Sequence, residues 1–340
     1  MRLVFFGSGE FGLPTLRALA SAHEVVGVVT QPDRPAGRGR ELTPTPIGAW
    51  AAANLPGVPL LKPDKVGVPE MVERIRAVPA DAWVVIAFGQ KLPPALLEGR
   101  FAINLHASLL PRWRGAAPIN AAILAGDAQT GNSVITLADR MDAGEILAQS
   151  SLAIDPGWTA GALHDLLSDQ GPPLVLKVLD DYARGMLDRR SQDETLATKA
   201  PKLSRADGWA GFASTAEECR RRIHGLTPWP GVTIRLSRSG VAQEIKVLLA
   251  RAIDAEAARR EFPSLPLVGH DPDQVGTLVE PAQGLVRCGA GTLLQLLQVT
   301  PAGSRPMAWS AFTHGRLPAP GSRVDGGRSS SGPAKGGAIG

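Results

Sequence analysis

Three polar residues, Asn104, His106 and Asp142, have the chemical types needed for acid–base work on an acyl group. A histidine near a carboxylate can move a proton at neutral pH, and a side-chain amide can donate a hydrogen bond to a developing oxyanion. The first two lie in the stretch INLHASLLPRWRGAAPIN, residues 103–120. This set suits acyl or formyl transfer by direct attack, although a histidine at the end of a strand is often only a hydrogen-bonded structural residue.

The elements around this stretch predict how these residues are positioned. Residues 101–105 form a short apolar run typical of a buried strand, and residues 115–124 have the composition and spacing of a helix. Polar groups just past the carboxyl end of a buried strand lie where open α/β sheets bind their ligands. We therefore expect a ligand crevice here.

Strands and helices alternate through the first half of the chain. This pattern predicts an α/β fold with a mostly parallel, Rossmann-like sheet. The expected strands are residues 2–6, 25–30, 58–61, 83–87, 131–137 and 145–153, and the expected helices are residues 13–21, 47–53, 69–77, 93–97 and 159–184.

The first turn of this fold carries the spacing Gly7-x-Gly9-x-x-Gly12 between a strand and a helix. Such a turn can hold a pyrophosphate at the start of the helix, which would make the protein a nicotinamide-dependent oxidoreductase. The second strand, however, continues into Gln31-Pro32-Asp33 and not directly into the expected carboxylate. The alternative is a tight turn that uses glycine for steric reasons. The chain has no GxSxG, Walker A or HExxH motif, so covalent serine, P-loop and zincin chemistry have no support.

Length and composition indicate a globular protein with two domains. The chain has 340 residues, of which 44% are hydrophobic and 20% charged. No apolar run approaches the roughly 20 residues needed to span a bilayer, and the N-terminal apolar run is too short for a secretory signal. The two cysteines, Cys219 and Cys288, lack metal-ligand spacing and favour a reducing compartment. We expect a cytoplasmic protein without a membrane segment.

Basic residues are concentrated in the second half of the chain. Residues 1–187 hold 16 Lys and Arg against 18 Asp and Glu, a net charge of −2, whereas residues 188–340 hold 20 against 14, a net charge of +6. This asymmetry favours a polyanionic partner such as nucleic acid, with an ordinary solubilising surface as the alternative.

Residues 31–46 contain four prolines and predict a long exposed loop, whose arginines suit phosphate contacts. These arginines are Arg34, Arg38 and Arg40.

The second half of the chain is predicted to form a separate β domain. Residues 188–205 lack periodicity and predict an extended linker, and Ser214-x-x-Glu217 predicts the capped start of a helix that continues to His224. The Arg220, Arg221 and Arg222 side chains on this helix either contact phosphate or form a solvated face. Short strands over residues 206–320 predict a small β-barrel, and the Gly/Ser-rich residues 321–340 predict a disordered tail. The expected strands are residues 232–236, 244–250, 276–279, 284–288 and 292–297.

Residues 103–119 resemble the signature of the methionyl-tRNA formyltransferase family. The stretches 30–40 (TQPDRPAGRGR), 141–144 (MDAG) and 192–198 (QDETLAT) also resemble it, so the likeness spans about residues 1–320. The resemblance implies a catalytic domain over residues 1–187 and an oligonucleotide-binding-type barrel over residues 206–320. It also implies transfer of the formyl group of 10-formyltetrahydrofolate to the α-amino group of methionyl initiator tRNA. The protein is then expected to be a cytoplasmic monomer that needs no metal.

The resemblance also implies residue roles. Asn104 and protonated His106 stabilise the tetrahedral oxyanion, and Asp142 either orients His106 or moves the amine proton. The tRNA acceptor arm meets the loop that bears Arg34, Arg38 and Arg40. The folate site is lined by Ser108, Leu109, Leu110, Pro111, Phe88, Gly89 and Leu92.

Formyltransferases that act on purine nucleotides or amino sugars share the Asn, His and Asp pattern. The basic loop, the Arg112-Trp113-Arg114 continuation and the basic second half favour tRNA as the acceptor. A non-catalytic RNA-binding protein and a nicotinamide-dependent oxidoreductase are the rival interpretations.

Overall fold

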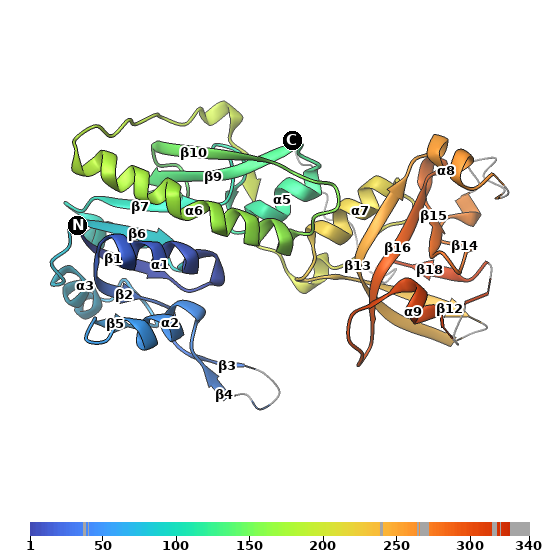
Figure 1. Ribbon diagram of the computed structural model, residues 1–340, viewed down its shortest axis with the longest axis horizontal. Helices are drawn as coiled ribbons and strands as arrows, with labels where there is room; N and C mark the ends of the chain where they lie inside the picture. Colours follow the sequence, from blue (N-terminus) through green and yellow to red (C-terminus); the bar gives the residue numbers. More distant parts are fainter. Residues whose placement is uncertain are drawn as a thin grey trace. The chain divides into compact units, whose positions relative to one another are not determined.

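The structure is a computed structural model that describes residues 1–36, 39, 41–238, 241–263, 265, 272–314, 318–319 and 321–326. The chain divides into two compact units, of which the first is mostly blue to green and the second mostly yellow to red in Figure 1. Unit 1 comprises Met1–Ala122, Ala128–Ile154 and Ala162–Lys202. Unit 2 comprises Ile123–Asp127, Asp155–Gly161 and the described residues from Leu203 onward. The sequence did not predict that two short segments of the first half belong to unit 2.

Unit 1 is built on a seven-stranded sheet with the order β10-β9-β7-β6-β1-β2-β5. The five strands from β7 to β5 are parallel to their neighbours, whereas β9 and β10 are antiparallel. This arrangement confirms the predicted Rossmann-like class. The strands are β1 (Arg2–Gly7), β2 (Glu24–Val29), β5 (Leu60–Leu61), β6 (Ala82–Ile86), β7 (Ala102–His106), β9 (Gln129–Thr136) and β10 (Ile146–Ala153).

Helices cover both faces of this sheet (Figure 1). Successive side chains of a strand point to opposite faces, so Phe6 and Trp83 pack with Ile75 of α3, whereas Leu105 contacts Gly171 of α6. The ring centroids of Phe6 and Trp83 are 5.2 Å apart. The helices are α1 (Leu13–Ala22), α2 (Pro46–Asn54), α3 (Pro69–Arg76), α4 (Pro94–Leu97), α5 (Pro118–Ala125) and α6 (Ala160–Ala183).

The helix predicted over residues 115–124 begins later than expected, at Pro118. Residues Arg114–Gly115 instead form strand β8, which pairs with β11 (Lys199–Ala200). The N–H groups of Ala116 and Ala117 donate to the Ala200 carbonyl at 2.8 and 3.3 Å, so their hydrogen bonds are satisfied outside the helix. Proline suits the first helical position because its missing N–H has no partner there.

Residues 31–46, predicted as an irregular loop, contain a two-stranded antiparallel hairpin. Its strands are β3 (Arg34–Ala36) and β4 (Glu41–Thr43). The prediction was wrong because a two-stranded ribbon leaves every second N–H unpaired and therefore tolerates proline. Two contacts close its base, a 2.6 Å hydrogen bond between the Thr30 and Thr45 hydroxyls and a 2.7 Å ion pair between Lys62 Nζ and Asp33. Arg38 and Arg40 lie outside the described residues.

Unit 2 is an antiparallel barrel, as predicted, with the strand order β14-β15-β16-β13-β12-β18. The ends of this order meet, because Leu278 N donates to Ser322 O and Val324 N donates to Gly276 O. The closing strand β18 falls within residues 321–340, so the expectation of disorder was wrong for residues 321–326. The strands are β12 (Val232–Arg238), β13 (Val241–Ile253), β14 (Leu278–Glu280), β15 (Leu285–Arg287), β16 (Leu293–Pro301), β17 (Met307–Ala308) and β18 (Arg323–Asp325).

Among the described residues of unit 2, the α-helices are α7 (Ala216–Gly225), α8 (Ala255–Glu261) and α9 (Trp309–Thr313). The apolar face of α7 packs Ile223 into a core with Val247, Leu294 and other buried residues. The cap of α7 lies one residue later than predicted: Thr215 Oγ1 accepts from Glu218 N, and Glu218 Oε2 accepts from Thr215 N at 2.8 Å.

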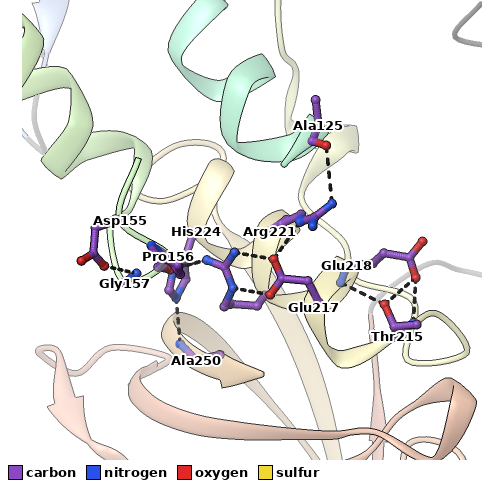
Figure 2. A network of polar contacts seen from close by, with 11 residues as sticks. Ala125, Asp155, Pro156, Gly157, Thr215, Glu217, Glu218, Arg221, His224 and Ala250 are labelled. Atoms are coloured by element: carbon purple, nitrogen blue, oxygen red, sulfur yellow. Dashed lines mark hydrogen bonds and ion pairs between the residues drawn. The ribbon is translucent and has the colours of Figure 1, made fainter. Parts of the chain in front are cut away.

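The three α7 arginines bind partners within unit 2. Glu217 accepts hydrogen bonds from both Arg220 and Arg221 at distances of 2.6 to 2.8 Å. Figure 2 shows the contact between Glu217 and Arg221. Arg220 also donates to the carbonyl of Pro156, and Arg222 donates to the carbonyls of Trp209 and Asp207. The three side chains therefore hold the fold of unit 2 together, a use that neither sequence interpretation had considered.

In the part of the chain that the structure describes, no helix combines the length and the apolar character needed to cross a membrane.

Candidate active site

His106 lies at the carboxyl end of β7, near the middle of the sheet, and only 6% of its surface is exposed. Its Nε2 is 2.9 Å from the carbonyl oxygen of Trp113. A carbonyl can only accept, so Nε2 carries the hydrogen of this bond. The bond fixes the ring and leaves Nδ1 as the nitrogen available for proton transfer.

Asp142 faces that nitrogen. Its Oδ2 lies 3.7 Å from His106 Nδ1, longer than a hydrogen bond, and accepts a 2.8 Å hydrogen bond from Gly115 N. Asp142 has a φ of +55°, in the left-handed region that few non-glycine residues adopt. The loop between β9 and β10 thus presents this carboxylate to His106.

Asn104 lies two residues before His106 on β7, so both side chains point to the same face of the sheet. Asn104 is half-buried, and its side-chain amide has no hydrogen-bond partner among the described residues. Its two N–H donors are free to bind a substrate oxygen. The structure therefore brings together all three residues of the predicted catalytic set on one side of the sheet.

The predicted folate-lining residues fall into two groups. Leu109 and Pro111 are half-buried and Gly89 is exposed, with a φ of +84°. The others are buried: the Ser108 hydroxyl donates to Arg112 O at 2.7 Å, and Leu110 packs against Ile135 and Ile146. Phe88 and Leu92 belong to the core beneath β6. Only the first group presents side-chain or backbone surface to a ligand.

Of the three predicted tRNA-contacting residues, the structure describes Arg34 alone. Arg34 is exposed on β3 and forms a 3.8 Å ion pair with Asp64. The structure describes neither Arg38 nor Arg40.

Segment 190–200, which was predicted as part of the linker, belongs to unit 1 and contacts the segments that carry Trp113 and Asp142, which the sequence did not predict. Thr198 Oγ1 accepts from Trp113 N at 2.9 Å, and Arg114 N donates to Thr198 O at the same distance. Gln192 contacts the Asp142 loop. The only signal was the resemblance of residues 192–198 to the family.

The Gly7 turn is explained by packing. A Cβ at Gly7 would lie 2.9 Å from the Ile86 carbonyl, and one at Gly12 would lie 3.2 Å from the Ile86 side chain. The Ser8 hydroxyl donates to Phe88 O and accepts from Gln31 N, which closes the turn. Glycine is therefore needed here for close approach, and this observation favours the steric interpretation of the motif.

Within the described residues, no group of three or more His, Cys, Asp or Glu side chains is placed to hold a metal ion. Cys219 and Cys288 are buried free thiols.

Comparison with known proteins identifies the class that this fold and site define. Residues 1–179 match the family model described as formyl transferase, and residues 202–317 match the model of the formyl transferase C-terminal domain. The chain belongs to the formyl transferase family.

Its relatives include a methionyl-tRNA formyltransferase from Methylobacterium sp. (strain 4-46), 38% identical over 95% of this chain and 99% of the relative. Another, from Citrifermentans bemidjiense, is 44% identical over 68% of this chain and 73% of the relative. Among solved structures, an N-formyltransferase from Helicobacter canadensis has a TM-score of 0.59 at 13% identity, over 86% of this chain and 98% of that one. The structural likeness supports the fold alone.

Proposed function

We propose that this protein acts in the cytoplasm and transfers the formyl group of 10-formyltetrahydrofolate to the α-amino group of methionyl initiator tRNA. The observation that carries this proposal is the position of Asn104, His106 and Asp142 on one side of the sheet, in a chain whose relatives are methionyl-tRNA formyltransferases.

The reaction replaces one C–N bond with another. The amine nitrogen of the acceptor attacks the formyl carbon, and the carbonyl oxygen takes the negative charge of the tetrahedral intermediate. The free amide of Asn104 donates to this oxygen, and a protonated His106 beside it stabilises the same charge. Collapse of the intermediate breaks the bond between the formyl carbon and the donor nitrogen.

The proton lost by the attacking amine ends on the departing nitrogen of the donor. The Asp142 carboxylate, which lies beside the Nδ1 edge of His106, can receive this proton and return it to the departing nitrogen. Because Oδ2 of Asp142 is held by the Gly115 N–H at 2.8 Å, the carboxylate keeps its place while the proton moves. Positioning of the two substrates contributes the remaining rate enhancement.

The formyl donor is of the folate type in this proposal. Two neighbours by structure support it: HypX from Aquifex aeolicus was solved with tetrahydrofolic acid, and the Helicobacter canadensis enzyme with folinic acid. Leu109, Pro111 and Gly89 are the members of the predicted folate set with accessible surface. Ser108 and Leu110 act from beneath, where their buried side chains fix the shape of the 108–111 turn.

The β3–β4 hairpin is the proposed contact for the tRNA acceptor arm. It carries Arg34 in a region rich in arginine, and the closed base formed by Thr30, Thr45, Asp33 and Lys62 gives it a defined direction. Arginine binds phosphate oxygens through a planar fork of donors.

The experiment measures transfer of labelled formyl from 10-formyltetrahydrofolate to methionyl initiator tRNA by wild type, His106→Ala and Arg38→Ala. His164→Ala is the matched control, because His164 also pairs with an aspartate of unit 1, at 2.9 Å from Asp165, but on α6. We expect wild type and His164→Ala to transfer formyl at similar rates. The kcat of His106→Ala should be about 10²- to 10⁴-fold lower than that of wild type, and Arg38→Ala should have a raised KM for tRNA.

The outcomes separate the parts of the proposal. Transfer to a small amine or an amino sugar but not to tRNA would mean that the acceptor is wrong and the chemistry right. No transfer to any amine would overturn the enzymatic assignment.

A further inference from the structure

The side chain of Gln192 joins two loops of the site. Its Nε2 donates to the carbonyl oxygens of Asp142 and Gly144, both at 2.7 Å, and its Oε1 accepts from Nε and Nη2 of Arg114 at 3.0 and 2.7 Å. A primary amide offers two donors and one oxygen with two lone pairs. Gln192 therefore uses its full hydrogen-bonding capacity between these loops.

Both loops contribute directly to the geometry around His106. The Asp142 loop carries the carboxylate 3.7 Å from His106 Nδ1, and the loop of Arg114 supplies the Trp113 carbonyl and the Gly115 N–H. A clamp between the loops sets the distance between His106 and Asp142.

The Asp142 backbone needs such a clamp. Its φ of +55° is unfavourable for an aspartate, and strained residues persist only where the surrounding structure fixes them. Gln192 binds the carbonyl of Asp142 itself and that of Gly144, whose Cβ position is blocked by the Thr136 carbonyl.

We propose that Gln192 is a positioning residue for formyl transfer, which holds Asp142 in place for His106 through the two carbonyls and Arg114. This inference rests on the proposed function. It assigns a mechanistic role to segment 190–200 of unit 1, in which Gln192 lies outside any helix or strand and is half-buried.

The pattern of bonds explains why a glutamine is needed. Glutamate has the same shape but would place a carboxylate against two carbonyl oxygens, and methionine fills the same space without donors or acceptors. The Arg114 guanidinium, whose side chain is 11% exposed, would lose a partner in the methionine variant but would keep Glu194 at 3.0 Å. A role in filling space alone would be tolerated by both replacements.

The test compares Gln192→Met and Gln192→Glu with wild type, using Gln243→Met as the matched control. Gln243 is a half-buried glutamine on β13 of unit 2. Three readouts are needed: kcat and KM for formyl transfer, the melting temperature, and amide exchange at Ala143 and Glu145. In wild type these amides donate to Arg140 O and Thr136 Oγ1 at 3.3 and 2.9 Å.

We expect both Gln192 variants to lower kcat about 10- to 100-fold, with both KM values within about twofold and a melting temperature near that of wild type. Their Ala143 and Glu145 amides should exchange faster, and Gln243→Met should change none of these. Adding Gln192→Met to Asp142→Asn should lower kcat no further, because Gln192 acts through Asp142.

Two results would overturn the inference: near-wild-type kcat in Gln192→Met, or effects of Gln192→Met and Asp142→Asn that multiply. Failure of the proposed function has a different signature, because the wild-type protein itself would then transfer no formyl to methionyl-tRNA. The exchange measurement does not depend on activity, so unchanged exchange in the Gln192 variants would reject the clamp in that case too.

Discussion

At the scale of single residues, Asn104 and His106 differ in how much of their hydrogen-bonding capacity the protein already uses. His106 commits Nε2 to the Trp113 carbonyl, whereas the Asn104 amide has no partner among the described residues. Asn104 is therefore the neutral donor with both N–H groups available for the oxyanion, and His106 contributes through its remaining nitrogen.

Replacing Asn104 by aspartate removes these donors without changing the shape of the side chain. We expect Asn104→Asp to lower kcat about 10²- to 10³-fold, because the oxyanion loses a hydrogen bond and gains a nearby negative charge. The melting temperature should hardly change, since the wild-type amide binds no other described residue. Formyl transfer assays with a thermal melt of the same sample test this, and a kcat within threefold of wild type would contradict it.

The sequence could predict Asn104, His106 and Asp142 but not Gln192. The first two share a strand, and Asp142 follows a strand expected in the same sheet, so side-chain chemistry and topology indicated the set and the family resemblance implied its roles. Gln192 acts mainly on carbonyl groups, which every residue carries, and it lies 50 positions from Asp142. No residue pattern marks such a contact.

At the scale of elements, the start of α7 illustrates why cap positions are hard to predict. The run Ser214-Thr215-Ala216-Glu217-Glu218 satisfies the capping-box pattern twice, once from Ser214 and once from Thr215. The structure uses Thr215 with Glu218, because Glu217 is engaged by Arg220 and Arg221. The helix itself was predicted, and its first residue depended on this competition.

Because only Thr215 caps the helix, alanine substitutions at Thr215 and Ser214 should differ in their effect on the free energy of unfolding. Thr215→Ala should lower the free energy of unfolding of unit 2 by about 1 kcal/mol, because Glu218 N loses its acceptor. Ser214→Ala should be nearly neutral, since the Ser214 side chain is exposed and has no partner among the described residues. Urea unfolding of the two variants measures the difference, and equal losses would mean that the cap is shared.

At the scale of the whole molecule, the sequence predicted two domain types but not how the barrel closes. Residues 321–326 were grouped with a Gly/Ser-rich tail, and composition alone does not distinguish a short closing strand from such a tail. Val324 is buried and pairs with Leu236, while its N–H donates to Gly276 O on the other side. Three residues are too few for a pattern of alternation.

Stability of unit 2 should depend on pH through His224, which is 2% exposed. Burial and the nearby Arg220 cation lower the pKa of His224 from 6.5 to about 4. Its Nε2 accepts from Ala250 N at 3.1 Å, so the neutral ring donates from Nδ1 to Pro156 O (Figure 2). Protonation would place a second charge beside Arg220 and break the bond to Ala250.

The sign follows from the two pKa values. Between pH 6.5 and 4 the unfolded chain binds a proton that the folded protein does not, so the stabilisation is present above pH 6.5 and is lost as pH falls to about 4. The loss should be on the order of 3 kcal/mol. Urea unfolding at several pH values measures it, and His224→Ala should be less stable at pH 7 with a shallower dependence in this interval. If the free energy of unfolding of His224→Ala depended on pH as steeply as that of wild type, groups other than His224 would cause the pH dependence.

The salt dependence of tRNA binding should distinguish arginines that contact phosphate from arginines that are paired with a carboxylate within the protein. The net charge of +6 in residues 188–340 includes Arg220 and Arg221, yet both side chains bind Glu217 within unit 2. Phosphate contacts release counterions, so log(kcat/KM) for methionyl-tRNA should fall linearly with log[salt].

Removing one cation that contacts phosphate reduces that slope by about 1. We expect this result for Arg38→Ala on the hairpin region, whereas Arg221→Ala should lower the melting temperature and leave the slope unchanged, because Glu217 already holds Arg221 at 2.8 Å. The measurement is kcat/KM at several salt concentrations for wild type and both variants. A reduced slope in Arg221→Ala but not in Arg38→Ala would contradict the proposal. It would mean that the tRNA phosphates contact α7 and not the hairpin, and that Arg221 leaves the Glu217 carboxylate when it binds phosphate.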